Sequence, residues 1–327
     1  MRCVKQSSHR RFAGGYLKEV FFIMHKLLCV VLSLLLCLTA AAACAEAPAW
    51  KVTAPAGAPA LALATLAVEN PDAYTFVAAD TIAAEFAKAE ADFIIAPLNA
   101  GAKLFAAGKS VYQVAAVVSW GNLYFASQKE NFQLSDISGA KITLFGENTI
   151  NSSIALYALE ANGIEAGEVE YLAGAATTQA LLLENPDAIV LTAEPALTAA
   201  NFKNEKVKGY PVNDLYKTAT GFDGYTQAAL FVNPEAVKAD PAGVAAFLAE
   251  VAASCAKCTE DVPAVAEAAV TLEILPNAKV AAAAIPHCAI RFVSALEARE
   301  QIEATANVDL SQFGGAVPAD GFYYAAE

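Results

Sequence analysis

The stretch Leu134–Leu172, LSDISGAKITLFGENTINSSIALYALEANGIEAGEVEYL, places one helical segment between two short β-rich segments. The β-rich segments are residues 141–145 and 168–172, and the helical pattern covers residues 152–162. A strand, a helix and a second strand in this order are typical of a βαβ unit with parallel strands. The stretch therefore predicts an α/β fold.

The same alternation continues toward both ends of the chain. On the N-terminal side we expect strands at 50–54, 75–79 and 92–96, helices at 58–68, 81–89 and 99–107, and β-rich segments at 111–118 and 122–127. On the C-terminal side we expect helices at 177–184 and 194–200 and strands at 188–191, 207–210 and 225–232, followed by an almost entirely helical segment to residue 304. Alternating strands and helices indicate mostly parallel sheets.

The order of these elements predicts two lobes. The helical segment beyond Pro234 is too amphipathic to stand alone, so we expect it to pack back on the first α/β unit. Lobe 1 would then be discontinuous, with residues 46–128 and 228–327, and lobe 2 would contain residues 129–227. Two crossing strands would serve as hinges, and the lobes would leave a cleft suited to a small ligand.

Composition and charge exclude several classes of protein. The chain has 327 residues, of which 57% are hydrophobic and 17% charged, so it has enough apolar surface to build a core and is not intrinsically disordered. Its length favours more than one lobe. The net charge of −13, with no basic stripe, excludes nucleic acid as a partner.

The N-terminal segment has the features of a targeting sequence. Residues 27–43 are apolar and uncharged, follow His25-Lys26 and end in small residues, which is typical of a secretory signal peptide. The apolar run falls short of the roughly 20 residues of a membrane span, although an uncleaved anchor stays open as the alternative. Because Met24 would itself be a normal start, we interpret residues 1–23 as translated leader and 24–44 as the signal peptide.

Two cleavage sites compete at the end of this signal. Ala43-Cys44-Ala45 fits the small-x-small rule of signal peptidase, with Glu46 as the new N-terminus. Ala41-Ala42-Ala43-Cys44 resembles a bacterial lipobox, with Ala41 in place of the usual leucine, and would make Cys44 the lipidated residue. We favour the lipoprotein. Either site places the mature protein outside the cytoplasm, as a secreted, periplasmic or lipid-anchored surface protein.

Three further cysteines lie outside the leader and signal. Cys255 and Cys258 are three residues apart in a helical pattern and face one side, and Cys288 follows a turn at Ile285-Pro286-His287. A disulfide is plausible outside the cell, so we expect Cys288 to bridge to one of the pair. A zinc site formed by these cysteines with His287 is the less favoured alternative, and we expect no metal.

The sequence offers little that would support catalysis. His287 is the one histidine beyond residue 44, and no Gly-x-Ser-x-Gly elbow, phosphate-binding Walker loop or Gly-x-Gly-x-x-Gly fingerprint occurs. Most acidic residues fall on helical segments, where a solvated face is the ordinary explanation. We therefore expect neither catalytic residues nor a cofactor.

Five segments carry a resemblance to a known family. They are Ala54–Pro59, Asp92–Pro97, Ser119–Asn122, Leu134–Ile142 and Gly146–Asn148. Together they resemble the solute-binding proteins of ABC transporters, in the branch similar to nitrate, sulfonate and thiamine-pyrimidine binders. The most specific element is Leu-x-Asp-Ile-x-Gly-x-Lys-Ile, which opens the second lobe in that family. Gly314–Pro318 and Phe322–Tyr324 look like the closing segment of a subgroup.

The resemblance implies a type II periplasmic-binding-protein fold, in which two lobes close on a ligand without altering it. It places ligand contacts in the loops after the first-lobe strands and at the start of the second-lobe helix. Carried onto this sequence, the contacts are Gly57, Ala58, Asn99, Trp120, Asn122, Asn148, Thr149 and Glu194. These loops hold no arginine or lysine of the kind expected in sulfonate and nitrate binders, which disfavours an anionic ligand.

The resemblance also implies the partners. They are a small-molecule ligand and the permease and ATPase subunits of an ABC importer, with membrane contact through a lipid anchor at most, and the protein is expected to be a monomer. Two alternatives stay open, an enzyme on the same fold and a cell-surface adhesion or redox protein that uses the cysteine region. Pyrimidine synthases that resemble this fold need a histidine and a cysteine-rich motif that this chain lacks.

Overall fold

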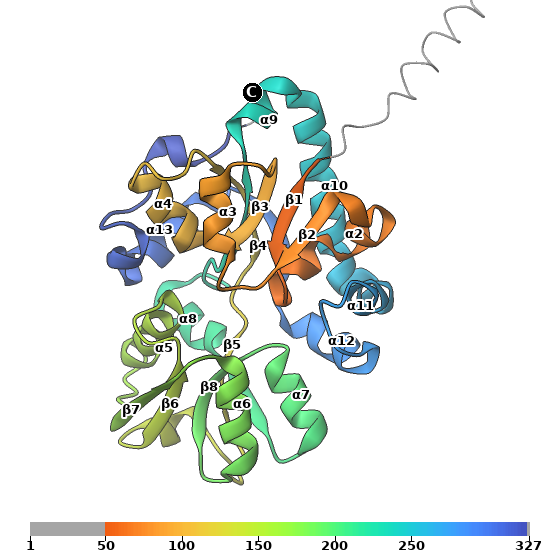
Figure 1. Ribbon diagram of the computed structural model, residues 1–327. Coiled ribbons are helices and arrows are strands. Elements are labelled where there is room, and N and C mark those ends of the chain that lie inside the picture. Colours follow the sequence, from red (N-terminus) through yellow and green to blue (C-terminus); the bar gives the residue numbers. More distant parts are fainter. Residues whose placement is uncertain (1–49, 326–327) are drawn as a thin grey trace, which may run out of the picture. The chain divides into compact units, whose positions relative to one another are not determined.

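The computed structural model describes residues 50–325, which form two β-sheets with helices against both faces of each (Figure 1). The expected leader, signal peptide and lipidation site at Cys44 lie outside the described residues. The α/β class predicted from the sequence is confirmed. The expectation of mostly parallel sheets is wrong, because five of the nine strand pairings within residues 50–325 are antiparallel.

The first sheet has six strands in the order β11-β4-β10-β3-β1-β2. These are β11 (Ile290–Ser294), β4 (Gln113–Ser119), β10 (Ala228–Val232), β3 (Phe93–Pro97), β1 (Val52–Pro55) and β2 (Tyr74–Val77). Strand β1 is parallel to β2 and β3, whereas β10 is antiparallel to β3 and β4, and β11 to β4. Strands β3, β4 and β10 are almost entirely buried, as expected for central strands covered on both faces.

Helices cover the two faces of this sheet (Figure 1). One face carries α3 (Ile82–Lys88), α4 (Leu98–Ala106) and α13 (Arg299–Val308), and the other carries α2 (Ala64–Glu69), α10 (Pro241–Glu260) and α11 (Val262–Thr271). The remaining helical elements of this part are η1 (Ala58–Leu63), η2 (Pro71–Ala73), α9 (Pro234–Ala239), α12 (Ala278–Ala284), η4 (Ile285–His287), η5 (Leu310–Phe313) and η6 (Asp320–Phe322). Helix α10 is long and apolar enough to cross a membrane, but its apolar side, including Val244, Phe247 and Val251, is buried in the core.

The second sheet has five strands in the order β7-β6-β8-β5-β9. These are β7 (Glu168–Leu172), β6 (Lys141–Phe145), β8 (Ile189–Ala193), β5 (Leu123–Ser127) and β9 (Lys208–Pro211). The βαβ unit predicted from the Leu134–Leu172 stretch is β6-α5-β7, with parallel strands and α5 at Ile150–Ala161. The other helices of this part are η3 (Leu134–Ile137), α6 (Ala175–Glu184), α7 (Ala196–Lys203) and α8 (Val212–Thr220).

The chain passes between the two sheets at two segments. The first crossing is Trp120–Asn122, between β4 and β5, and the second is residues 221–227, between α8 and β10. Strand β5 falls within 46–128, the range expected for lobe 1, but it pairs with β8 and β9 of the second sheet. The crossing therefore comes before β5, where Gly121, with φ 85°, turns the chain. The composition of the sequence does not change there, so the sequence does not mark this boundary.

The segment after Pro234 packs back on the first sheet, but it is not all helix. Strand β11 lies inside it and forms the edge of the sheet beside β4, and Tyr323 bridges to Val114. The expectation of an almost entirely helical segment is wrong here. The strand is only five residues long, and its pairing partner β4 is far away in sequence.

The disulfide expected for Cys288 is not present. Cys255, Cys258 and Cys288 are all free and buried in one apolar cluster. The thiol of Cys258 donates to Leu61 O at 3.8 Å and that of Cys288 to Ala284 O at 3.3 Å, so these two sulfurs are directed at backbone carbonyls. Burial raises the pKa of Cys258 to about 12 and that of Cys288 well above its usual value. These cysteines are core residues with little thiolate character.

Candidate functional site

A cavity of about 340 Å³ lies where the loops of the two sheets face each other. The first sheet contributes the loops that follow β1, β2 and β3, and the second contributes the start of α5. The two crossing segments complete the lining. The lining residues are Pro55, Ala56, Pro59, Ala79, Pro97, Asn99, Ala100, Asn122, Thr149, Ile150, Asn151, Gln227 and Ala228. Both sheets and both crossings therefore contribute to a single cavity of the size that small-molecule sites have.

Hydrogen-bonded amides join the two crossing segments at the cavity wall. Gln227 Nε2 donates to Asn122 Oδ1 at 2.9 Å, and Asn122 Nδ2 donates to Glu194 O at 2.8 Å. Ser119 Oγ donates to Gln227 Oε1 at 3.2 Å. The two amide side chains are thus held in fixed orientations by each other and by both sheets, which makes them part of the scaffold of the cavity.

Two other amides at the cavity make no hydrogen bond to the part of the chain that the structure describes. Asn99, in the first turn of α4, and Asn151, in the first turn of α5, line the cavity from the two different sheets. Within residues 50–325, neither side chain makes a hydrogen bond. Each amide offers two donors and an acceptor, so a bound molecule could be contacted from both sheets at once.

The helix starts add backbone donors to the same cavity. Neither α4, which begins after Pro97, nor α5, which begins after Thr149, has a side chain that caps its first turn. The Thr149 hydroxyl donates instead to Gly146 O at 2.6 Å. The N–H groups of a first helical turn have no partner inside the helix and carry its positive end. Two such turns beside the cavity favour a ligand that has hydrogen-bond acceptors.

No ionisable side chain is among the lining residues that the structure describes. The walls are proline, alanine and isoleucine, and the polar groups are amides and one hydroxyl. Proton transfer needs a titratable group within hydrogen-bond reach of the substrate. The lining suits recognition of a small molecule and offers no general acid or base.

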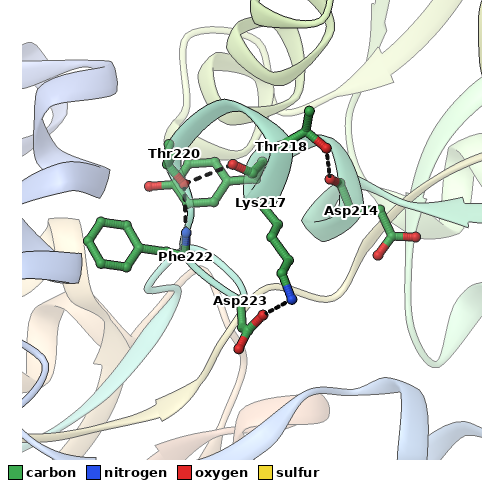
Figure 2. Close-up of polar contacts among 7 residues, drawn as sticks. Asp214, Lys217, Thr218, Thr220, Phe222 and Asp223 are labelled. Atoms are coloured by element: carbon green, nitrogen blue, oxygen red, sulfur yellow. Dashed lines mark hydrogen bonds and ion pairs between the residues drawn. The ribbon is translucent and has the colours of Figure 1, made fainter.

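The second crossing is ordered by contacts at the end of α8. Thr220 Oγ1 donates to Tyr216 O at 2.8 Å. Phe222 N donates to Thr220 Oγ1 at 3.2 Å (Figure 2). Lys217 forms an ion pair with Asp223, which lowers the pKa of that carboxyl (Figure 2). Gly221 ends the helix in the left-handed conformation. The chain therefore leaves α8 along a defined path toward Gln227.

A sequence profile of the family described as NMT1/THI5 like matches residues 78–263. This match covers more than half of the chain and includes all of the second sheet. The chain belongs to the NMT1/THI5-like family. No curated protein matches the sequence.

Solved structures with the same fold include transporter components from three bacteria. A Parabacteroides distasonis ABC transporter structure shares 22% identity at a TM-score of 0.73, over 85% of this chain and 99% of that one. The aliphatic sulphonate binding protein SsuA of Escherichia coli shares 16% identity at 0.65, over 84% and 92%. The alkanesulfonate-binding protein SsuA of Xanthomonas axonopodis pv. citri, bound to MOPS, shares 14% identity at 0.62, over 86% and 100%. The two-lobed type II binding-protein fold predicted from the sequence is confirmed.

Three of the eight ligand contacts predicted from the family resemblance line this cavity. They are Asn99, Asn122 and Thr149. Gly57 and Ala58 do not line it, although their neighbours Ala56 and Pro59 do, and Ala58 is buried in the first-sheet core. The loop after β1 thus reaches the cavity through different residues from those predicted.

Trp120 and Asn148 lie elsewhere. Trp120 is buried in the core, where its Nε1 donates to Arg291 O at 3.0 Å and the Arg291 guanidinium lies 4.2 Å from the ring centroid. Asn148 is exposed, with φ 57°, and its carbonyl accepts a hydrogen bond from Gln312 Nε2 at 3.0 Å. Neither side chain lines the 340 Å³ cavity.

Glu194 also points away from this cavity. Its backbone carbonyl accepts the bond from Asn122, but its side chain lines a second cavity that has no lining residue in common with the first. At Glu194, the backbone carbonyl thus supports the wall of the first cavity through its hydrogen bond with Asn122, while the carboxyl group lines the second cavity.

Sequence analysis missed Gln227, Asn151 and Ala79 among the lining residues. Asn151 immediately precedes the helix predicted at 152–162, so the sequence does contain a signal for it. Gln227 lies inside a segment that reads as one continuous strand, 225–232. Only the start of β10 at Ala228 shows that Gln227 belongs to the crossing.

Proposed function

We propose that this protein is an extracytoplasmic solute-binding protein that delivers a small molecule to an ABC importer. Membership of the family and the shared fold with sulfonate-binding proteins support this role. The observation that carries the proposal is the 340 Å³ cavity, to which both sheets and both crossings contribute. The partners would be a permease and an ATPase, and the lipid at Cys44 would hold the protein at the outer face of the membrane.

The ligand proposed for this cavity is small and uncharged or mildly polar, with hydrogen-bond acceptors. The apolar walls and the absence of lysine and arginine among the lining residues argue against a ligand with several negative charges. The amides of Asn99 and Asn151 and the first turns of α4 and α5 supply donors. No catalytic step is proposed, because the cavity offers no acid or base.

Closure follows from the position of the two amides. A ligand that bonds to Asn99 and Asn151 together contacts both sheets, so it binds more tightly when they approach each other. Such differential affinity shifts the population toward the closed form. The backbone of the two crossing segments changes conformation as the parts move. Because Trp120–Asn122 is short, it limits how far one part can shift relative to the other.

The test is a thermal-shift screen of the mature protein with thiamine precursors, sulfonates, nitrate, flavins and amino acids, followed by calorimetry on each compound that stabilises the protein. Asn99→Ala and Asn151→Ala should each weaken binding by about tenfold, the effect of one lost hydrogen bond that no other group replaces. Because these side chains have no hydrogen-bond partner among residues 50–325, the melting temperature without ligand should hardly change.

Asn148→Gly is the matched control. Residue 148 lies three positions from Asn151, is not among the lining residues and has a φ of 57° that glycine adopts readily. It should bind like wild type. Chemical conversion of any bound compound by the purified protein, or full affinity in both asparagine variants, would contradict the proposed function.

A further inference from the structure

A second cavity, of about 410 Å³, lies beside β8 and α7. Residues of β5, β9 and α7 line it from the second sheet and its helices, and α12 and η4 line it from the helices that pack with the first sheet. Asn201, Phe202 and Lys208 on its rim are exposed, which shows that the cavity is open to solvent. Of the contacts implied by the family resemblance, Glu194 alone lines this cavity, and the resemblance assigns it to the cleft ligand.

The carboxyl group of Glu194 forms the buried end of this cavity. Glu194 is only 5% exposed. Thr198 donates to it twice, from its backbone N to Oε2 at 3.1 Å and from its Oγ1 to Oε1 at 3.0 Å. Each carboxylate oxygen has lone pairs beyond these single bonds. The group is thus positioned by α7 and still able to accept hydrogen bonds from the cavity.

No cation balances this carboxylate within the part of the chain that the structure describes. Glu194 makes no ion pair there, although Lys208 lines the same cavity at its exposed rim. Burial raises the pKa of Glu194, and the bonds from Thr198 and the nearby His287 oppose that rise. A buried carboxylate without a counter-charge is costly, and a cation bound at this position would remove the cost.

The remaining lining suits an organic cation better than a metal ion. Tyr124 contributes an aromatic ring to the lining, and rings attract cations through their faces. The ring of Phe202, at the exposed rim, already has Lys279 Nζ 5.2 Å from its centroid. Residues 50–325 contain no cluster of three or more His, Cys, Asp or Glu side chains that could hold a metal, and a metal ion at Glu194 would have a single carboxylate. An ammonium group has three donors, which a carboxylate and neighbouring oxygens can accept.

We propose that this second cavity binds a small organic cation with a primary ammonium group, which donates hydrogen bonds to the carboxylate of Glu194. The volume accommodates a short aliphatic amine, with the carbon chain against Leu197 and Val207 and the outer end at the solvent-exposed rim. This site is separate from the cleft ligand of the proposed function, because the two cavities have no lining residue in common.

Calorimetric titration of the mature protein with ethanolamine and putrescine tests the proposal. Tetramethylammonium is the matched probe, since it has the same charge and no N–H donor. Both amines should bind with a saturable heat, and tetramethylammonium should bind at least tenfold more weakly. The ring signals of His287, the one histidine beyond residue 44, should shift in NMR spectra as the amines bind.

Three variants test whether the amines bind in this cavity. Glu194→Gln keeps the shape and removes the charge, and it should weaken amine binding at least tenfold. Ala283→Phe fills the cavity from α12 without touching the carboxylate and should weaken binding as much. Glu205→Gln, which changes the charge of an exposed residue in the loop after α7, should bind amines like wild type.

The cleft variant Asn151→Ala should bind the amines normally, so failure of the proposed function would not affect this result. No saturable binding of either amine up to about 10 mM would overturn the proposal. Equal binding by wild type, Glu194→Gln and Ala283→Phe would do the same, as would amine binding that leaves the His287 signals unchanged.

Discussion

At the scale of single residues, the backbone and the side chain of Glu194 contribute to different cavities. The carbonyl of Glu194 holds Asn122 at the wall of the first cavity, while its carboxyl group is buried beside the second. Asn122 in turn is fixed by Gln227. These residues are scaffold, whereas the amides of Asn99 and Asn151 are available to a ligand because no group among the described residues bonds to them.

Glu194→Gln should stabilise the protein at neutral pH. The raised pKa of Glu194 means that the folded state holds the proton more tightly than the unfolded chain does. The ionised form therefore destabilises the fold above the folded-state pKa, and this loss disappears below the ordinary value of 4.5. His287, Tyr124 and Lys208 are the other titratable groups that line this cavity. We expect a melting temperature about 2 °C above wild type at pH 7, without amines present.

Calorimetry at pH 7 and pH 4 checks this prediction. The difference between Glu194→Gln and wild type should shrink toward zero at the lower pH, where the native carboxyl is protonated as well. Glu205→Gln, at an exposed position, should show little difference at either pH. A variant less stable than wild type at pH 7 would show that the bonds from Thr198 outweigh the cost of burial.

At the scale of elements, the position of α4 depends on a close approach to β10. Gly101 faces the ring of Phe231, and a Cβ at this position would lie 2.3 Å from Phe231 Cζ. Phe231 is fully buried and packs edge-on against Phe86 at a centroid distance of 5.0 Å, so it has no room to move. The same helix carries Asn99 and Ala100 at the first cavity. Glycine at 101 therefore fixes the distance between that cavity wall and the sheet.

Gly101→Ala should destabilise the protein by about 2 kcal/mol, the usual cost of overpacking a filled core, despite the better helix propensity of alanine. Ligand affinity at the first cavity should fall as well, because α4 has to shift. Denaturant unfolding measures the first effect and calorimetry the second. Gly174→Ala is the control, since φ is −167° there and no atom lies within 4 Å of the added Cβ. Equal stability of Gly101→Ala and wild type would contradict the account of α4.

At the scale of the whole described region, polar contacts outside the crossings also join the two parts. Ser153 Oγ, on α5, donates to Asp309 Oδ2 at 2.7 Å, and Gln312 Nε2 donates to Asn148 O at 3.0 Å. Beside the second cavity, Tyr124 OH donates to His287 O at 3.1 Å. These bonds link the first part to two places in the second part, the start of α5 and strand β5. They therefore stabilise the present arrangement of the two sheets.

Ser153→Ala combined with Gln312→Ala should let the two parts separate more often in the absence of ligand. The radius of gyration from small-angle X-ray scattering should then exceed that of wild type, and a saturating cleft ligand should restore the wild-type value. Ligand affinity should drop by about tenfold or less, because part of the binding free energy now closes the molecule. Identical scattering by variant and wild type without ligand would show that these bonds do not hold the arrangement.

The sequence alone determined the α/β class, the βαβ unit at 134–172, the two-lobed fold and three of the cavity residues, Asn99, Asn122 and Thr149. These follow from hydrophobic periodicity and from turns at strand ends, which are local properties of the chain. Tertiary structure alone decided that β5 belongs to the second sheet, that β11 is a strand, and that the three cysteines stay free. It also directed Trp120 into the core and the Glu194 carboxyl into the second cavity. Which way a side chain points from a loop depends on the pairing of strands far apart in sequence, and no local pattern contains that information.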